Sequence, residues 1–153
     1  MAMTDDKAVF IDTNVLVYAS IPESPLHPVA LGAIQTLEQA DRELWISRQV
    51  LREYLATLTR PQIFIEPISV AMLAVAIRQF ENRFQVAEDN QQVTQRLLEL
   101  IERIAVGGRQ IHDANIVATM QIYGVHQLLT HNTTDFERFA EFITVLPLVE
   151  NEG

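Results

Sequence analysis

The stretch Ala8-Val9-Phe10-Ile11-Asp12-Thr13-Asn14 joins four apolar residues directly to an acidic one. A short, continuous apolar run of this kind is typical of a buried strand in a parallel sheet. Asp12 therefore lies at the carboxyl end of the expected strand. Ligand sites in parallel α/β sheets form outside the carboxyl ends of the strands, so the sequence predicts that this carboxylate faces a functional site.

Strand and helix patterns alternate along the rest of the chain. Helices are indicated by apolar residues that recur every three or four positions, and several have clear ends, such as Pro28 at a start and Gly124 at a stop. The alternation with short connections predicts an α/β fold, in which helices cover both faces of a central parallel sheet. We expect further strands at 44–47, 127–130 and 142–146 and a shorter one at 84–86. No repeat or linker divides the 153 residues, so a single domain is expected over 1–153, with a core from about 8 to 147.

Composition excludes several classes of protein. The chain has no cysteine, so disulfides, thiolate zinc sites and thiol catalysis are ruled out. It has no run of about 20 apolar residues, and its start lacks the pattern of a signal peptide, so we expect a cytoplasmic protein without a membrane span. The net charge of −9 counts against a strong, standalone nucleic-acid binder and suits a small basic partner protein. Ten of the eleven basic residues are arginine, which suits bidentate phosphate contacts.

Three more acidic residues occupy comparable places in the expected fold. Glu53 lies on the helix after the second strand, off its apolar face, and Asp113 lies in the first turn of the helix that leads to the fourth expected strand, 127–130. Asp135 follows that strand. Four carboxylates brought together without a cation would raise one another's pKa values. Because hard divalent cations such as Mg²⁺ prefer oxygen ligands and phosphate, the pattern predicts a site for such a cation and phosphodiester chemistry.

Each acid also has a purely structural interpretation. Asp12 would serve as a helix cap, Asp113 would favour a helix dipole, and Asp135 would suit a turn. Glu53 alone would be a solvated surface residue. The conjunction favours the metal site, because four independent capping or surface positions need not fall at one edge of a sheet. The histidines are too scattered for a histidine metal site and are interpreted as incidental: His27, His112, His126 and His131.

Five segments together resemble the PIN domain, and specifically the VapC-type toxins of bacterial toxin–antitoxin pairs. They are Phe10 to Leu16, the helix from Gln49 to Pro61, His112 to Ala118, Tyr123-Gly124, and Leu129 to Phe136. The resemblance implies a three-layer α/β/α fold and a Mg²⁺- or Mn²⁺-dependent endoribonuclease that hydrolyses RNA. It also implies a homodimer that a cognate antitoxin inhibits. The residues that match the family's acidic quartet, as catalytic and metal-binding groups, are Asp12, Glu53, Asp113 and Asp135. Those that match its polar supports are Thr13, Asn14, Thr130 and Asn132.

Within that quartet, Asp12 and Asp113 are the best candidates for direct metal ligands. Two other functions stay open: a noncatalytic PIN-like module that acts through protein contacts, and another Mg²⁺-dependent phosphoesterase. A phosphoaspartyl mechanism normally needs a second aspartate two residues after the nucleophile and a lysine elsewhere. Here Asp12 is followed by Thr13-Asn14, and Lys7 is the only lysine. The RNA target is not indicated by any motif.

Overall fold

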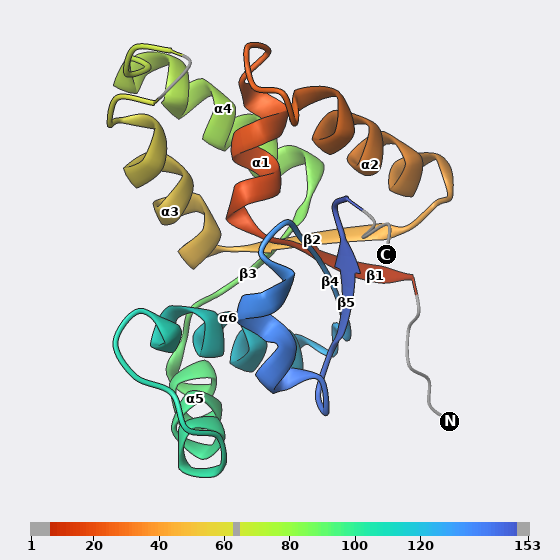
Figure 1. Ribbon diagram of the computed structural model, residues 1–153, viewed down its shortest axis with the longest axis vertical. Helices are drawn as coiled ribbons and strands as arrows, with labels where there is room; N and C mark the ends of the chain where they lie inside the picture. The colour runs from red at the N-terminus through yellow and green to blue at the C-terminus, as the bar shows by residue number, and fades with distance from the viewer. Residues whose placement is uncertain (1–6, 63–64, 150–153) are drawn as a thin grey trace.

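The computed structural model describes residues 7–62 and 65–149 (Figure 1). Its five strands form one sheet in the order β3-β2-β1-β4-β5, and every neighbouring pair is parallel. In Figure 1, α1 to α4 lie on one side of the sheet and α5 and α6 on the other. The predicted three-layer α/β/α arrangement is confirmed. The elements are β1 (Ala8–Ile11), α1 (Thr13–Ser20), α2 (His27–Gln39), β2 (Glu43–Ser47), α3 (Arg48–Leu58), α4 (Val70–Arg83), β3 (Gln85–Ala87), α5 (Gln91–Arg103), α6 (Gln110–Tyr123), β4 (Gln127–Thr130), the 3₁₀ helix η1 (Thr133–Phe139) and β5 (Thr144–Pro147).

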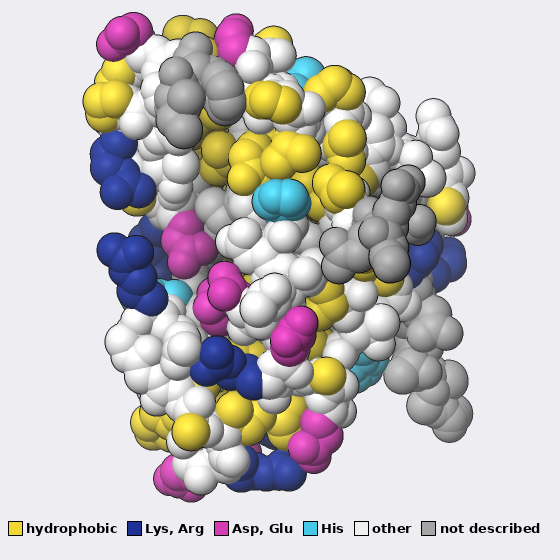
Figure 2. Space-filling model, viewed as in Figure 1, with side chains coloured by type: hydrophobic (Ala, Val, Ile, Leu, Met, Phe, Trp, Pro, Cys, Tyr) yellow, Lys and Arg dark blue, Asp and Glu magenta, His cyan; other side chains and the backbone are white. Residues whose placement is uncertain are grey.

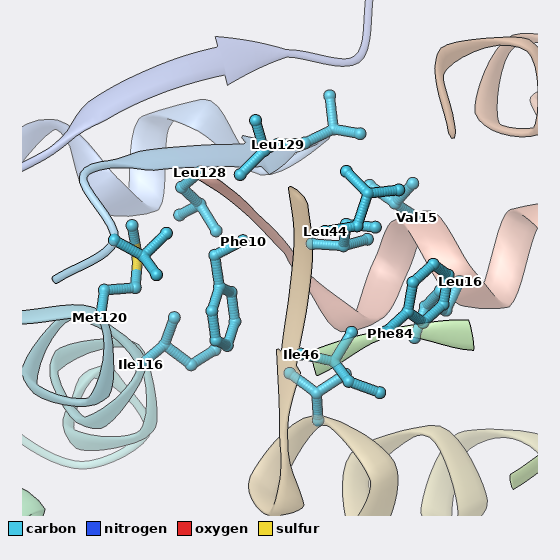
Figure 3. Close-up of a cluster of buried hydrophobic side chains, with 14 of the residues drawn as sticks. Phe10, Val15, Leu16, Leu44, Ile46, Phe84, Ile116, Met120, Leu128 and Leu129 are labelled. Atoms are coloured by element: carbon cyan, nitrogen blue, oxygen red, sulfur yellow. The ribbon is translucent and has the colours of Figure 1, made fainter. Parts of the chain in front are cut away.

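The central strand β1 is buried on both faces, as its continuous apolar run predicts. Phe10 faces Ile116 and Met120 of α6, whereas Leu16 and Phe84 lie on the other side of β2 (Figure 3). These side chains belong to one buried cluster that spans the sheet. Burial on both faces fixes the register of β1, and it thereby fixes Asp12 at the carboxyl edge of the sheet.

Two elements end or begin at least two residues away from the sequence prediction, whereas β2 and β3 differ from it by one residue. The last strand begins at Thr144, because the amides of Phe142 and Ile143 instead bond to the carbonyl of Phe139 and close the turn after η1. Helix α5 ends at Arg103 rather than at the glycine pair 107–108. Its cap, Ile104, is extended and packs its side chain against the core, so apolar spacing continues where the helix does not.

Local signals explain most other boundaries. The Ser69 hydroxyl accepts a hydrogen bond from the amide of Met72 and starts α4. Gly124 adopts a φ of 72° and ends α6, a conformation that a side chain would strain. Over 7–62 and 65–149, no helix combines the length and the apolar character needed to cross a membrane.

Candidate functional site

Asp12 is held by the residues around it. It is the N-cap of α1, and its Oδ1 accepts a hydrogen bond from the amide of Thr13 at 2.8 Å. Its Oδ2 accepts from Nδ2 of Asn14 at 3.0 Å and from the hydroxyl of Thr130 at 2.8 Å. The side chain is only 6% exposed. The structural interpretation of Asp12 as a cap is therefore confirmed, yet about one of its four acceptor positions, on Oδ1, is left for a ligand.

The polar residues that follow Asp12 and β4 tie two chain segments together. Asn14 Nδ2 also lies 3.3 Å from the hydroxyl of Thr130, and Asn14 Oδ1 accepts from the amide of His131 at 3.0 Å. The Thr130 hydroxyl in turn accepts from the amide of Asn132 at 3.0 Å. Thr130 is fully buried, so these bonds fix the end of β4 against the start of α1. Asn132 contributes through its backbone, and its side chain lines the cleft described below.

Glu53 is half-buried and bonded on both oxygens, so its interpretation as a solvated surface residue is wrong. Its Oε1 accepts from the hydroxyl of Thr13 at 2.7 Å, and its Oε2 accepts from Nε2 of Gln49 at 3.1 Å. Thr13 thus links Glu53 directly to the backbone next to Asp12. The two acids come from helices on the same side of the sheet, and Thr13 joins them, because its amide donates to Asp12 and its hydroxyl donates to Glu53.

Gln49 is a connecting residue that sequence reasoning missed. Besides Glu53, its amide group donates to the carbonyl of His112 at 2.9 Å, and its oxygen accepts from Asn115 at 2.8 Å. It is only 5% exposed. Gln49 therefore bridges α3 to α6 across the carboxyl edge of the sheet. Its position four residues before Glu53 on one helix was the available signal, because such residues share a face.

Asp113 lies in the first turn of α6, and Asp135 lies in the first turn of η1. Burial, followed by the negative charges of Asp12, Asp135 and Glu53, raises the pKa of Asp113 to about 7. Arg138 opposes this shift in pKa. Burial and the charge of Glu53 likewise raise the pKa of Asp12 to about 6, even though three hydrogen bonds favour its charged form. Asp113 therefore lies close enough to the other three predicted acids to be affected by their negative charges.

Three of these acids line a cleft of about 800 Å³ at the carboxyl edge of the sheet. Asp12, Glu53 and Asp113 face it, and Asp135 is not among its lining residues. Figure 2 shows Asp and Glu side chains near the middle of the molecule, with Lys and Arg side chains beside them at the left margin. Other lining residues were not predicted to be functional: Gln49, Arg52, Arg60, Gln62 and Arg109.

In the part of the chain that the structure describes, no group of three or more His, Asp or Glu side chains is arranged to hold a metal ion. The acids share a cleft and feel one another's charge, but they are not gathered around one point. Their chemistry nevertheless fits a hard divalent cation, because the lining supplies several carboxylate oxygens and Asp12 keeps a free acceptor position.

The family model described as the PIN domain matches residues 9–142. The chain belongs to the PIN domain family. The resemblance seen in the sequence is thereby confirmed, and the parallel sheet with helices on both faces is the fold of this PIN domain.

This PIN domain is also similar to individual proteins. It is 27% identical over 133 residues to "Ribonuclease VapC48" of Mycobacterium tuberculosis, an alignment that covers 84% of this chain and 89% of that one. A toxin–antitoxin complex from Klebsiella pneumoniae contains a chain that is 20% identical, with a TM-score of 0.62 and coverage of 94% and 99% of the two chains. VapC20 of M. tuberculosis, described as a sarcin-ricin loop cleaving toxin, is 19% identical, with a TM-score of 0.63 and coverage of 91% and 99%. At these identities the solved structures support the fold alone.

The raised pKa of Asp113 predicts how stability depends on pH in metal-free buffer. A carboxyl group whose pKa rises from 3.8 in the unfolded chain to about 7 in the folded protein adds stability that is fully present below pH 3.8. That stability is lost as the pH rises through about 7. Asp113→Asn stays neutral, so in EDTA at pH 8 it should unfold at a higher urea concentration than the unsubstituted protein.

Urea unfolding at pH 4, 6 and 8 measures this difference, which should shrink toward pH 4. Glu102→Gln, an exposed substitution on α5, is the matched control and should show no such trend. Parallel urea midpoints for Asp113→Asn and the unsubstituted protein at every pH would contradict the crowding of charge around Asp113.

Proposed function

We propose that this PIN domain is a Mg²⁺- or Mn²⁺-dependent endoribonuclease that hydrolyses RNA phosphodiester bonds and acts as the toxin of a toxin–antitoxin pair. It works in the cytoplasm as a single domain and forms a homodimer. One observation carries the proposal: acids from three separate elements face one polar cleft, and two of them have pKa values raised by burial and mutual repulsion. Perturbed carboxylates in a cleft are typical of functional sites. The relative named as a ribonuclease supports the choice of RNA.

The proposed roles follow from how freely each carboxylate can accept a ligand. Asp113 has no side-chain hydrogen bond within the described residues and is the most available metal ligand, and Asp12 offers its remaining position on Oδ1. Glu53 and Asp135 complete the site directly or through water. A bound divalent cation would supply positive charge to the scissile phosphate and lower the pKa of the attacking water. Four polar residues orient the acids: Thr13, Asn14, Thr130 and Asn132.

The hydrogen bonds around Asp12 prepare the site before substrate binds. Asn14 and Thr130 hold the Oδ2 atom, so the carboxylate plane of Asp12 is fixed and Oδ1 keeps its direction. Glu53 is similarly fixed by Thr13 and Gln49. Preorganised groups of this kind accelerate a reaction because they need little rearrangement when charge develops. The chain's own residues therefore position water and phosphate, and no histidine or lysine is required as a proton carrier.

The proposed regulator is a small basic protein that places an arginine or lysine in the acidic cleft. The chain carries a net charge of −9, and several similar solved structures are toxin–antitoxin complexes. A guanidinium forms two parallel hydrogen bonds with a carboxylate and would compete with a cation for the same oxygens. A gene for such a protein beside this one would support the assignment.

One observation favours a second candidate, a PIN domain that acts only through protein contacts: the described acids are not gathered around a common point. Another Mg²⁺-dependent phosphoesterase is a third candidate. Activity on RNA distinguishes all three, because only the ribonuclease needs both the cation and an RNA strand.

Cleavage of single-stranded RNA is expected with Mg²⁺ or Mn²⁺ and should stop in excess EDTA, because the carboxylates alone cannot offset the charge of the phosphate. Returning Mn²⁺ should restore the rate. Product analysis on a gel, with RNA and DNA of the same sequence, measures the effect. Cleavage at the same bonds in EDTA, by protein purified to constant specific activity, would contradict metal dependence. Cleavage of the DNA but not of the RNA would show that the substrate is DNA.

A further inference from the structure

Three arginines line the cleft, and they differ in whether a carboxylate pairs with them. Arg52 is ion-paired, with its guanidinium 3.1 Å from Oδ2 of Asp89. Arg60 donates from Nε to the carbonyl of Ala56 at 3.1 Å, and no carboxylate pairs with it in the described part of the chain. Arg109 likewise has no ion-pair partner among the described residues. Two cations therefore remain available in the cleft of a protein with a net charge of −9.

The two arginines extend the two helical walls of the cleft. Lining residues on and just after α3 follow helical spacing as far as Arg60, which lies about two turns, or roughly 10 Å along the axis, beyond Glu53. Those on α6 begin at Arg109, about one turn, or roughly 6 Å, before Asp113. The starts of α3 and α6 meet at the same edge of the sheet (Figure 1). Each wall thus carries one acid and, farther along, one unpaired arginine.

We propose that Arg60 and Arg109 hold backbone phosphates of the RNA strand on either side of the bond that is cleaved. The inference rests on the proposed ribonuclease function and adds the residues that hold its substrate. Acids alone would repel a polyanion, so the strand needs cations at a distance from the acidic centre. A guanidinium offers five donors and remains charged, and it suits a phosphate oxygen pair. Arg52 is left out because Asp89 already occupies its guanidinium.

Binding of a fluorescent single-stranded RNA to Asp113→Asn protein, which should cut it far more slowly than the unsubstituted protein, tests the proposal across a range of salt concentrations. Arg60→Gln and Arg109→Gln, added singly to that protein, should each weaken binding several-fold. Each should also reduce the slope of log K against log salt by about 0.7, the value for one lost phosphate contact on a single strand. Arg60→Lys keeps the charge and should keep the slope.

Arg78→Gln is the matched control. It removes the same charge as the cleft variants, but Arg78 is exposed on α4 and lies outside the acidic cleft. Equal losses of affinity and slope for Arg78→Gln and the two cleft variants would overturn the inference and leave the ribonuclease function standing. Failure of the unsubstituted protein to bind or cleave RNA would overturn both. Melting temperatures for all variants show whether each is folded, and Arg60→Lys separates charge from packing.

Discussion

Asp113→Asn protein should cleave RNA roughly 100- to 1,000-fold more slowly than the unsubstituted protein, with its fold intact. The amide has nearly the volume of the carboxylate but cannot supply a negative charge to a divalent cation. The expected loss corresponds to about 3–4 kcal/mol of transition-state stabilisation. Asp113 is the most informative position, because it has no side-chain hydrogen bond within the described residues and its pKa is raised to about 7 by burial and neighbouring acids.

Asp12→Asn should lose activity to a similar degree, because it removes a negative charge from the metal site and also disturbs the hydrogen bonds around Asp12. One acceptor oxygen must replace two, so the hydrogen bonds from Thr13 and from the Asn14–Thr130 pair cannot all be kept. Some loss of stability should therefore accompany the loss of activity, unlike Asp113→Asn. Initial rates measured beside circular dichroism and thermal melting separate the two effects. Glu102→Gln is the control for the loss of a distant charge. An undiminished, metal-dependent rate in the Asp113→Asn protein would contradict the assignment of Asp113 as a metal ligand.

Expression of the protein alone should stop growth of a bacterial host that lacks its partner, because RNA cleavage depletes RNA that the cell needs. The Asp113→Asn form should be tolerated at the same expression level. Co-expression of a small basic protein encoded next to this one should restore growth, and the two proteins should purify together. Colony counts after induction, with immunoblots to match expression, measure the effect.

Two outcomes of that experiment have different meanings. Normal growth with the active protein, combined with RNA cleavage in vitro, would contradict the toxin role and leave the ribonuclease proposal standing. Growth arrest by both the active and the Asp113→Asn forms would show that toxicity does not depend on the acidic site. A complex that forms equally well with the acidic-site variants would place the partner outside the cleft.

The sequence predicts the central strands of this fold because short, continuous apolar runs indicate strands that are buried on both faces. The strands Ala8–Ile11 and Gln127–Thr130 match the predicted bounds, and both are buried along most of their length. Their carboxyl ends carry Asp12 and the Thr130–Asn132 segment to one edge, so topology alone brought the acids together. The ends of helices and strands were harder to predict. Ile104 and Ile143 are apolar at the expected spacing, but they pack against the core from turns rather than from a helix or strand.

Residues that work across helices were not predictable in the same way. Gln49 contacts the carbonyl of His112, which lies 63 positions later in the chain, and no local pattern indicates that pairing. Arg60 and Arg109 are isolated charges in the sequence and do not belong to a basic tract. Only the approach of the starts of α3 and α6 at the sheet edge brings them to one cleft. From sequence alone, an arginine next to a helix end is interpreted as a solvated surface residue, because the position of the neighbouring helix is not known.

The central claim is that Asp12, Glu53, Asp113 and Asp135 form a divalent metal site, and anomalous scattering from crystals soaked in Mn²⁺ tests it most directly. A peak in the cleft is expected between Asp12 and Asp113, at a coordination distance of about 2.1 Å from their oxygens, as is usual for small divalent cations. Crystals of Asp113→Asn protein treated identically should lack the peak or show it much weakened. Manganese bound only outside the cleft, or an unchanged peak in Asp113→Asn, would contradict the account.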